Sequence, residues 1–226
     1  MEKWRSPRGQ YVMALAVASF VSMGLFVYGA WRSQDFTASY LPWNLVLAWL
    51  PLMLAVWLMD ILRRKAWSSW EGIAASFLWM AFLPNSFYLI SDFIHLQEVD
   101  PAYVLYDAVM FTSFVFTGLA LGFTSLYLVH GALKQRLDGR RSAIWTGMVL
   151  LFCSIAIYMG RDLRWNTWDI FVNPAGLLFE AADRLQHPAS YPHMLLVITI
   201  FFVLLTTIYN LLWRAARLLS EGAKPR

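Results

Sequence analysis

Residues 108–129 read AVMFTSFVFTGLALGFTSLYLV, a stretch of 22 residues without a single Asp, Glu, Lys or Arg. A helix of about 20 residues is long enough to cross the hydrocarbon core of a bilayer. This stretch is apolar on every side, whereas a helix that packs on a soluble core keeps one polar face. It therefore predicts a membrane-spanning helix, and with it a membrane protein.

Five further stretches have a similar length and the same apolar character. Together with the first, they predict an all-α integral membrane protein with six transmembrane helices. The stretch nearest the N-terminus has 21 uncharged residues and no small-residue cleavage site, which favours an uncleaved span over a signal peptide. In a single membrane domain of residues 1–226, we place the spans at about 11–31, 44–62, 72–90, 105–130, 143–160 and 194–213.

The composition of the chain supports the same class. Hydrophobic residues make up 59% of the 226 residues and charged residues only 14%, whereas soluble domains have about 25% charged residues. Because Cys153 is the single cysteine, an intrachain disulfide is excluded, and no Cys/His spacing of a zinc site occurs. The sequence identifies no cofactor.

The basic residues of the loops predict the orientation of the chain. Of the 18 Lys and Arg residues, 14 lie in the two terminal segments and in the loops on the same side of the membrane. Since cytoplasmic loops are enriched in Lys and Arg, both termini are expected in the cytoplasm (N-in/C-in) of a multipass protein of the cell membrane. The pI near 9.3 follows from this distribution, so it does not support nucleic-acid binding. The basic residues left on the outer side are Arg32, Arg161, Arg164 and Arg184.

Two local signals predict where helices begin. The run Ser68-Ser69-Trp70-Glu71 has the spacing of a capping box at the start of the third span. Asn173 and Pro174 are typical of an N-cap and a first helical residue, and His187-Pro188 ends the pattern. This short amphipathic helix is expected to be interfacial, lying on the outer side of the membrane, with an apolar face formed by Leu177, Leu178, Ala181 and Leu185.

Polar residues concentrate at the predicted outer end of the third span. Such residues are costly inside a membrane, so their placement is evidence about function. Four of them are separated by 3, 4 and 3 residues, which on an α-helix confines them to an arc of about 80°. Pro84 removes a backbone donor and predicts a kink just before them. The four residues are Asn85, Tyr88, Asp92 and His95.

Two other segments are expected at the same level of the membrane. Asp107 lies near the outer start of the fourth span, and two arginines follow the fifth. Two arginines can hold a phosphate or carboxylate with a fork geometry that lysine lacks. The candidate ligand-binding residues for an anionic small molecule or lipid headgroup are therefore Arg161, Arg164, Asn85, Tyr88 and Asn166.

Three titratable side chains at this end are the candidates for chemistry. Asp92, His95 and Asp107 are candidate acids and bases, and together they are candidate ligands of a metal ion. No recognised nucleophile or catalytic motif accompanies them, so enzymatic activity stays an open question. The alternative is that Asp92 and His95 mark a helix end in the headgroup region and that the arginines pair with lipid phosphate or with these carboxylates.

The same residues carry a resemblance to a known family. The strings LPNSFYLISDFIHL at 83–96 and GRDLRWNTWD at 160–169, together with Asp107, are similar to the motifs of an uncharacterised family of bacterial multipass membrane proteins, domain of unknown function 1361. The likeness covers most of the chain from the second span onward. It implies a membrane protein and brings no activity, substrate or cofactor with it.

Three classes of function agree with these patterns. The first is an outward-facing polar site that binds or acts on an anionic small molecule or lipid headgroup. The second is a structural or accessory subunit of a membrane complex, with a membrane-protein partner, in which the polar cluster holds helices together. A transporter is less favoured, because the charges lie near one face instead of the midplane and no internal repeat is visible.

Overall fold

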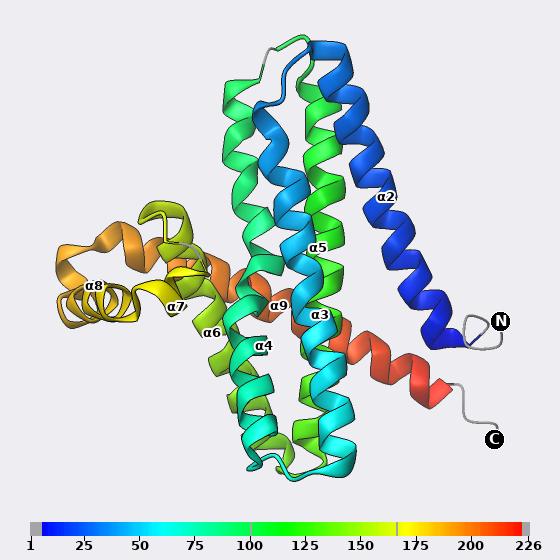
Figure 1. Cartoon of the computed structure of the whole chain (residues 1–226), viewed down its shortest axis with the longest axis vertical. Coiled ribbons are helices and arrows are strands. Elements are labelled where there is room, and N and C mark those ends of the chain that lie inside the picture. The colour runs from blue at the N-terminus through cyan, green and yellow to red at the C-terminus, as the bar shows by residue number, and fades with distance from the viewer. Residues whose placement is uncertain (1–5, 100, 166, 223–226) are drawn as a thin grey trace. The chain divides into compact units, whose positions relative to one another are not determined.

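The computed structural model describes residues 6–99, 101–165 and 167–222. Throughout these ranges the regular elements are helices, and six helices are long and apolar enough to cross a membrane (Figure 1). The predicted all-α membrane protein with six spans is therefore confirmed. The six helices are α2 (Pro7–Ser33), α3 (Tyr40–Arg64), α4 (Trp70–Tyr88), α5 (Val104–Lys134), α6 (Gly139–Asp162) and α9 (Pro192–Gly222).

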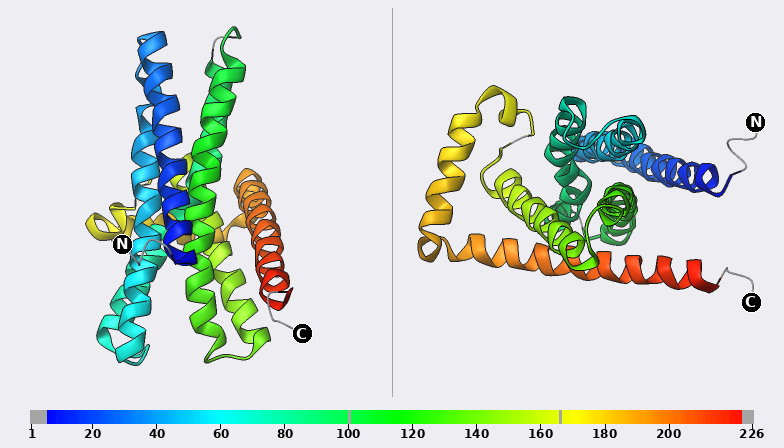
Figure 2. Two further views of the ribbon diagram at one scale, coloured as in Figure 1. Left: turned by 90° about the vertical axis from the view of Figure 1, so that its right-hand side faces the viewer. Right: turned by 90° about the horizontal axis from the view of Figure 1, so that it is seen from below.

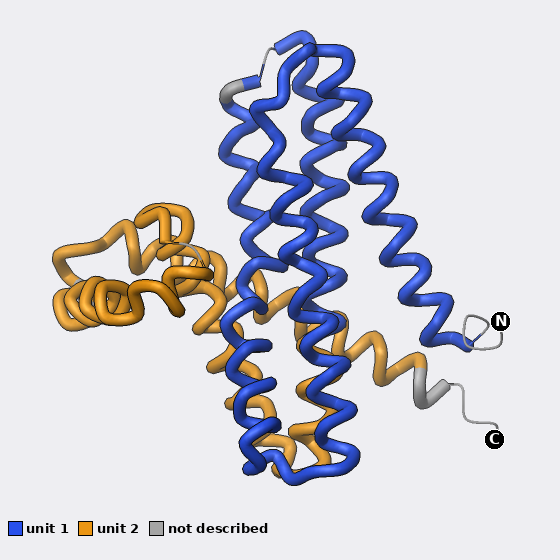
Figure 3. The backbone as a smooth tube through the Cα atoms, in the orientation of Figure 1, with its two compact units in different colours: residues 1–125 blue, residues 126–226 orange. Residues whose placement is uncertain are grey.

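The chain divides into two compact units, which Figure 3 distinguishes by colour. Unit 1 comprises Met1–Ser125 and unit 2 comprises Leu126–Arg226. Helix α5 contributes its first part to unit 1 and its last turns to unit 2. Each unit is described by itself below.

In unit 1, α3 and α4 pack along each other and α5 approaches α4 closely (Figure 2). Buried hydroxyl and indole groups cross-link the three helices. Trp79 Nε1 donates to Ser125 Oγ at 2.7 Å, and Ser125 Oγ donates to the carbonyl of Pro51 at 2.9 Å. Ser86 Oγ donates to the carbonyl of Ala48 at 3.0 Å. Such bonds satisfy polar groups that cannot hydrogen-bond to water inside a membrane.

In unit 2, α6 and α9 pack on each other around a small apolar cluster. Two short helices, α7 (Asp169–Val172) and α8 (Pro174–Gln186), lie between them along the chain (Figure 2), and α8 covers part of this cluster. The fully buried members of the cluster are Tyr158, Met159, Met194 and Ile198.

The expected start and end of α8 are confirmed. Asn173 is the N-cap and its Oδ1 accepts from the backbone N–H of Gly176 at 3.1 Å. Pro174 is the first helical residue and His187 follows the last one. Leu177 and Ala181 pack against the apolar cluster as expected, but Leu178 is exposed on another face. The side chain of Leu185 lies outside the described residues.

The expected capping box of α4 is wrong by one residue. The N-cap is Ser69, whose Oγ accepts from the backbone N–H of Gly72 at 3.2 Å, and the helix begins at Trp70. Glu71 forms an ion pair with Lys65. Because that tertiary partner holds its carboxylate, Glu71 does not serve the reciprocal bond that a capping box with Ser68 requires.

The helix that carries the polar residues of the third span also differs from the expectation. It continues through Pro84 but ends as an α-helix at Tyr88, and residues 89–98 form a 3-10 helix, η2 (Leu89–Glu98). In a 3-10 helix, residues three apart lie directly above one another. Leu89, Asp92 and His95 therefore lie in a row on one side of η2, and this row replaces the arc that we predicted for a continuous α-helix.

Candidate functional site

The predicted outer end of unit 1 gathers the end of α2, the start of α3, the whole of η2 and the start of α5, at the top of Figure 1. Asp92 is enclosed there, with 1% of its surface exposed. Asn44, in the first turns of α3, donates its Nδ2 proton to Asp92 Oδ2 at 3.0 Å. A carboxylate that is removed from water needs such partners, because burial of an unpaired charge costs several kcal/mol.

His95 lies one turn of η2 beyond Asp92 and is partly buried. Its ring packs against the ring of Tyr40, with 5.0 Å between the centroids. Tyr40 and Asn44 are separated by one turn on α3, as Asp92 and His95 are on η2. The Tyr40–His95 and Asn44–Asp92 contacts thus lie about one turn apart where α3 meets η2.

Asp107 lies in the first turn of α5, at the same end of unit 1. The guanidinium of Arg32 acts on it electrostatically. Arg32 also packs on two aromatic rings, 3.8 Å from the centroid of Tyr103 and 5.2 Å from that of Tyr106. An arginine over an aromatic face gains a cation–π attraction. Arg32, which the sequence placed on the outer side, was not among the predicted site residues.

The two remaining candidates of the third span lie on α4. Asn85 is partly buried and donates from Nδ2 to the carbonyl of Phe82 at 3.0 Å. Tyr88 is also partly buried, and its carbonyl accepts from Ser91 Oγ at 2.7 Å. Both residues thus lie in the segment that leads from α4 into η2.

The predicted arginines belong to unit 2. Arg161 lies in the last turn of α6 and is partly buried, whereas Arg164 is exposed in the loop that follows. Arg164 has a φ of 58°, a left-handed conformation that is uncommon for a residue with a side chain. The third predicted residue of this segment, Asn166, lies outside the described residues. Arg161 and Arg164 thus lie three residues apart at the end of α6.

Within residues 6–99, 101–165 and 167–222, no group of three or more His, Cys, Asp or Glu side chains that could hold a metal ion occurs. A metal at Asp92, His95 and Asp107 stays a prediction from the sequence.

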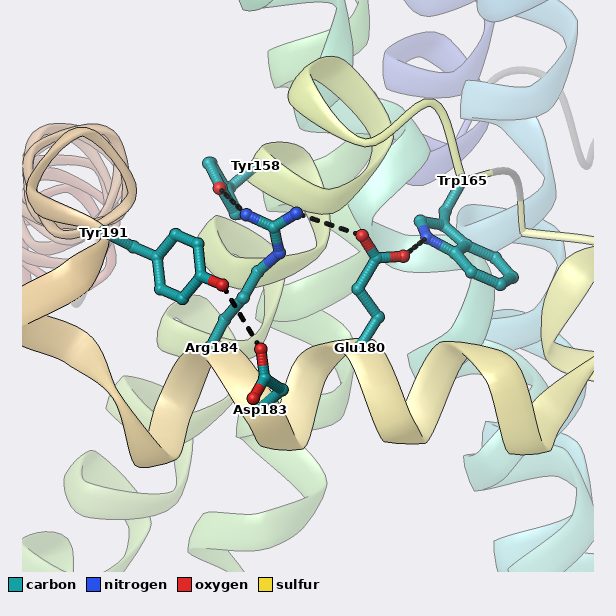
Figure 4. A network of polar contacts seen from close by, with 6 residues as sticks. All are labelled: Tyr158, Trp165, Glu180, Asp183, Arg184 and Tyr191. Atoms are coloured by element: carbon teal, nitrogen blue, oxygen red, sulfur yellow. Dashed lines mark hydrogen bonds and ion pairs between the residues drawn. The ribbon is translucent and has the colours of Figure 1, made fainter.

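A second polar network, which was not predicted, joins α8 to α6, to the loop after α6 and to Tyr191, the residue before α9, in unit 2 (Figure 4). Arg184 is its centre: Nη1 donates to the hydroxyl of Tyr158 at 3.1 Å, and Nη2 donates to Glu180 Oε1 at 3.0 Å. The guanidinium lies over the ring of Tyr191, 4.7 Å from its centroid. Trp165 Nε1 donates to the second oxygen of Glu180 at 2.6 Å. The network thus ties one face of α8 to three other segments.

The network shifts the pKa of its acidic residue, Glu180. The hydrogen bond from Trp165, followed by that from Arg184, lowers the pKa of the Glu180 carboxyl below its usual range. The i,i+4 spacing of Glu180 and Arg184 was visible in the sequence and is a common ion-pair spacing. Their contacts with Tyr158 and Trp165 were not, because these join residues far apart along the chain.

The comparisons with known proteins identify a family and assign no activity. A family model described as "Protein of unknown function (DUF1361)" matches residues 43–208. This range covers well over half of the chain and includes Asp92, His95, Asp107 and both predicted arginines. No curated protein and no solved structure matches the chain.

Proposed function

Since the chain belongs to the DUF1361 family, whose description assigns no activity, we propose a function from its own residues. We propose that it is a multipass membrane protein that binds an anionic small molecule or lipid headgroup at the predicted outer end of its spans. The observation that carries this proposal is the enclosure of Asp92, with Asn44 bonded to it, at the end of an apolar helix. Ionisable groups enclosed at membrane depth are costly and mark functional sites by default.

In this proposal the arginines recognise the ligand. Arg161 and Arg164 supply two guanidinium groups within one turn of chain, and a guanidinium binds phosphate or carboxylate through two parallel hydrogen bonds. Asn166 is the proposed polar contact beside them. In unit 1, Asn85 and Tyr88 are proposed separately as polar contacts, and Asp92 and His95, aligned on η2, and Asp107 as groups that could give or take a proton.

The structure also favours a second candidate function, that of a structural or accessory subunit. The bond between Asn44 and Asp92 joins α3 to η2, and the contact between Tyr40 and His95 does the same one turn away. Polar pairs of this kind hold transmembrane helices together without any ligand. The two candidates make different predictions for the same variants.

The test is the thermal unfolding of the purified protein in detergent, with and without added lipid. A ligand that binds only the folded state raises its stability as the ligand concentration exceeds Kd. We expect short-chain phosphatidylglycerol, which is anionic, to raise Tm, and zwitterionic short-chain phosphatidylcholine to leave it unchanged. Inorganic phosphate in a separate titration distinguishes a free anion from a headgroup.

Substitutions assign the effect to residues. Arg161→Lys and Arg164→Lys keep the charge but lose the fork geometry, so each should reduce the shift. Arg63→Lys, an exposed residue at the other end of α3, is the matched control and should keep the full shift. Equal shifts with both lipids would contradict the anion site. If Asp92→Asn and His95→Ala lower Tm without lipid by as much as they reduce the lipid shift, the structural function is the correct one.

A further inference from the structure

The α7–α8 segment of unit 2 exposes several large apolar side chains. The largest exposures are those of Val172 at 81%, Leu178 at 67% and Phe179 at 82%. Trp168 and Phe171, on and just before α7, are about half exposed. We call these five side chains the α7–α8 apolar face. Apolar surface of this kind costs about 25 cal/mol per Å² in water.

The other sides of α8 make contacts within unit 2. Leu177 and Ala181 pack on the apolar cluster of α6 and α9, and Glu180 and Arg184 form the polar network. At about 100° per residue, Phe179 lies about 160° from Ala181 and about 140° from Arg184, whereas Leu178 lies between the inner and the outer side. Asp183, exposed and polar, lies at the edge next to Phe179. The helix therefore has an inner side, an apolar outer side and a polar edge.

The polar network sets the roll of α8 about its own axis. Arg184 is held by Tyr158 of α6, by Glu180 of its own helix and by the ring of Tyr191 (Figure 4). Trp165 holds the other oxygen of Glu180. A rotation of α8 would break several of these contacts together, so the network keeps the apolar face turned outward.

The neighbours of α8 along the chain identify what covers this face. Residues 163–173 connect α8 to α6 and residues 187–191 connect it to α9, and both of these helices are apolar and long enough to cross a membrane. Both helices also expose apolar side chains, such as Phe152 and Leu196, that face lipid in a spanning helix. The apolar face of α8 thus continues a surface whose solvent is the acyl chains of the bilayer.

We propose that the α7–α8 apolar face inserts into the lipid leaflet at the end where α6 stops and α9 begins, with Phe179 among the acyl chains and Asp183 toward water. An amphipathic helix of this kind buries its apolar side about 5–10 Å into the boundary between headgroups and acyl chains. The insertion requires no anionic ligand, so it stands independently of the proposed binding site.

Single labelled cysteines test the insertion. Phe179→Cys and its matched control Asp183→Cys, one turn apart on α8, each carry an environment-sensitive fluorophore in protein reconstituted into phosphatidylcholine vesicles. The native Cys153 is fully buried, and labelling of the unsubstituted protein measures its background. Nitroxides on the lipid acyl chains should quench the label at 179 more strongly than the label at 183, and aqueous iodide should do the reverse.

Other outcomes would overturn the proposal. Equal quenching of both labels by iodide would mean that the face lies in water. Protection of the label at 179 from both quenchers would mean that a second copy or another protein covers it.

The role of the network has its own test in the same vesicles. Arg184→Gln removes the stacked guanidinium and should reduce the difference between the two labels, whereas Arg140→Gln, an exposed residue at the start of α6, should leave it unchanged. An unaltered difference in Arg184→Gln would show that the network does not set the roll of the helix.

Discussion

At the scale of single residues, two of the enclosed polar groups have partners on other segments. His130, which has 6% of its surface exposed, hydrogen-bonds through Nδ1 to the hydroxyl of Tyr209 at 2.7 Å and stacks on Trp213 at 4.1 Å. In unit 1, Asp92 has Asn44 as its partner. Because a membrane offers no water to an unpaired group, such partners stabilise an enclosed polar side chain.

The first prediction concerns Asn44. Asn44→Ala leaves Asp92 Oδ2 without the amide donor and should lower the free energy of unfolding in detergent by about 1 kcal/mol, the usual size of a polar contact between membrane helices. Asn210→Ala is the control, since Asn210 is exposed and donates only within its own helix. An equal loss in both variants, measured by thermal unfolding, would contradict the importance of the Asn44–Asp92 bond.

The second prediction concerns Glu180 and pH. Its folded-state pKa is lowered, so the charged form contributes stability above the usual glutamate pKa of about 4.3. That contribution should disappear as the pH falls below this value toward the folded-state pKa. The protection factors of the α8 amides, which are corrected for the slower intrinsic exchange at low pH, should therefore fall on acidification. Glu180→Gln should weaken this dependence, whereas Asp60→Asn, which removes an exposed acid of α3, should preserve it; the reverse result would refute the assignment.

At the scale of helices, two glycines of α5 determine how closely it approaches α4. A Cβ atom at Gly118 would lie 2.7 Å from the carbonyl oxygen of Ser86, and one at Gly122 would lie 2.7 Å from the Cβ of Ser86. Small residues four apart allow transmembrane helices to pack backbone against backbone. This close approach brings Trp79 within hydrogen-bonding distance of Ser125.

The third prediction follows from that contact. Gly122→Ala should cost about 1–3 kcal/mol of stability in detergent, the range found when a methyl group is forced into a packed interior. Gly131→Ala, in the same helix, is the matched control, because nothing lies within 4 Å of the added Cβ and alanine favours the helix. If Gly122→Ala leaves the free energy of unfolding unchanged in a chemical unfolding series, α4 and α5 do not approach each other as closely as this contact requires.

At the scale of the whole molecule, the charge distribution and the six spans predict its orientation. Fourteen Lys and Arg residues are predicted on one side of the membrane and four on the other, and the alternation between basic and non-basic loops holds through every predicted loop. Anionic headgroups and the insertion machinery retain positive loops in the cytoplasm. Both termini are therefore expected inside, and the α7–α8 segment outside.

The fourth prediction tests this orientation with reporter fusions. A reporter active only in the cytoplasm should be active after Arg226 and inactive after Asp100, and a periplasmic reporter should give the opposite pattern. Fusion after Leu137, in the loop between the fourth and fifth spans, is an internal control expected to behave like the C-terminal fusion. A periplasmic signal at Arg226 would refute the N-in/C-in topology.

The sequence alone determined the class of the protein, its six spans and the limits of α8. These are local properties: the length of an apolar stretch decides whether a helix can span a bilayer, and Asn173-Pro174 places a helix start by itself. The sequence also predicted that the polar residues of the third span and Asp107 meet at one end. That followed from the alternating direction of successive spans.

Only the tertiary structure decided which side chains became partners. Asn44 for Asp92, the rings of Tyr103 and Tyr106 for Arg32, and Tyr158 for Arg184 lie on other elements, far along the chain. The conversion of α4 to a 3-10 helix at Leu89, which changed the predicted arc, was not readable from its residues either. The reason is physical: contacts between helices depend on rotation and register, and these are set by packing over the whole interface, not by any single stretch.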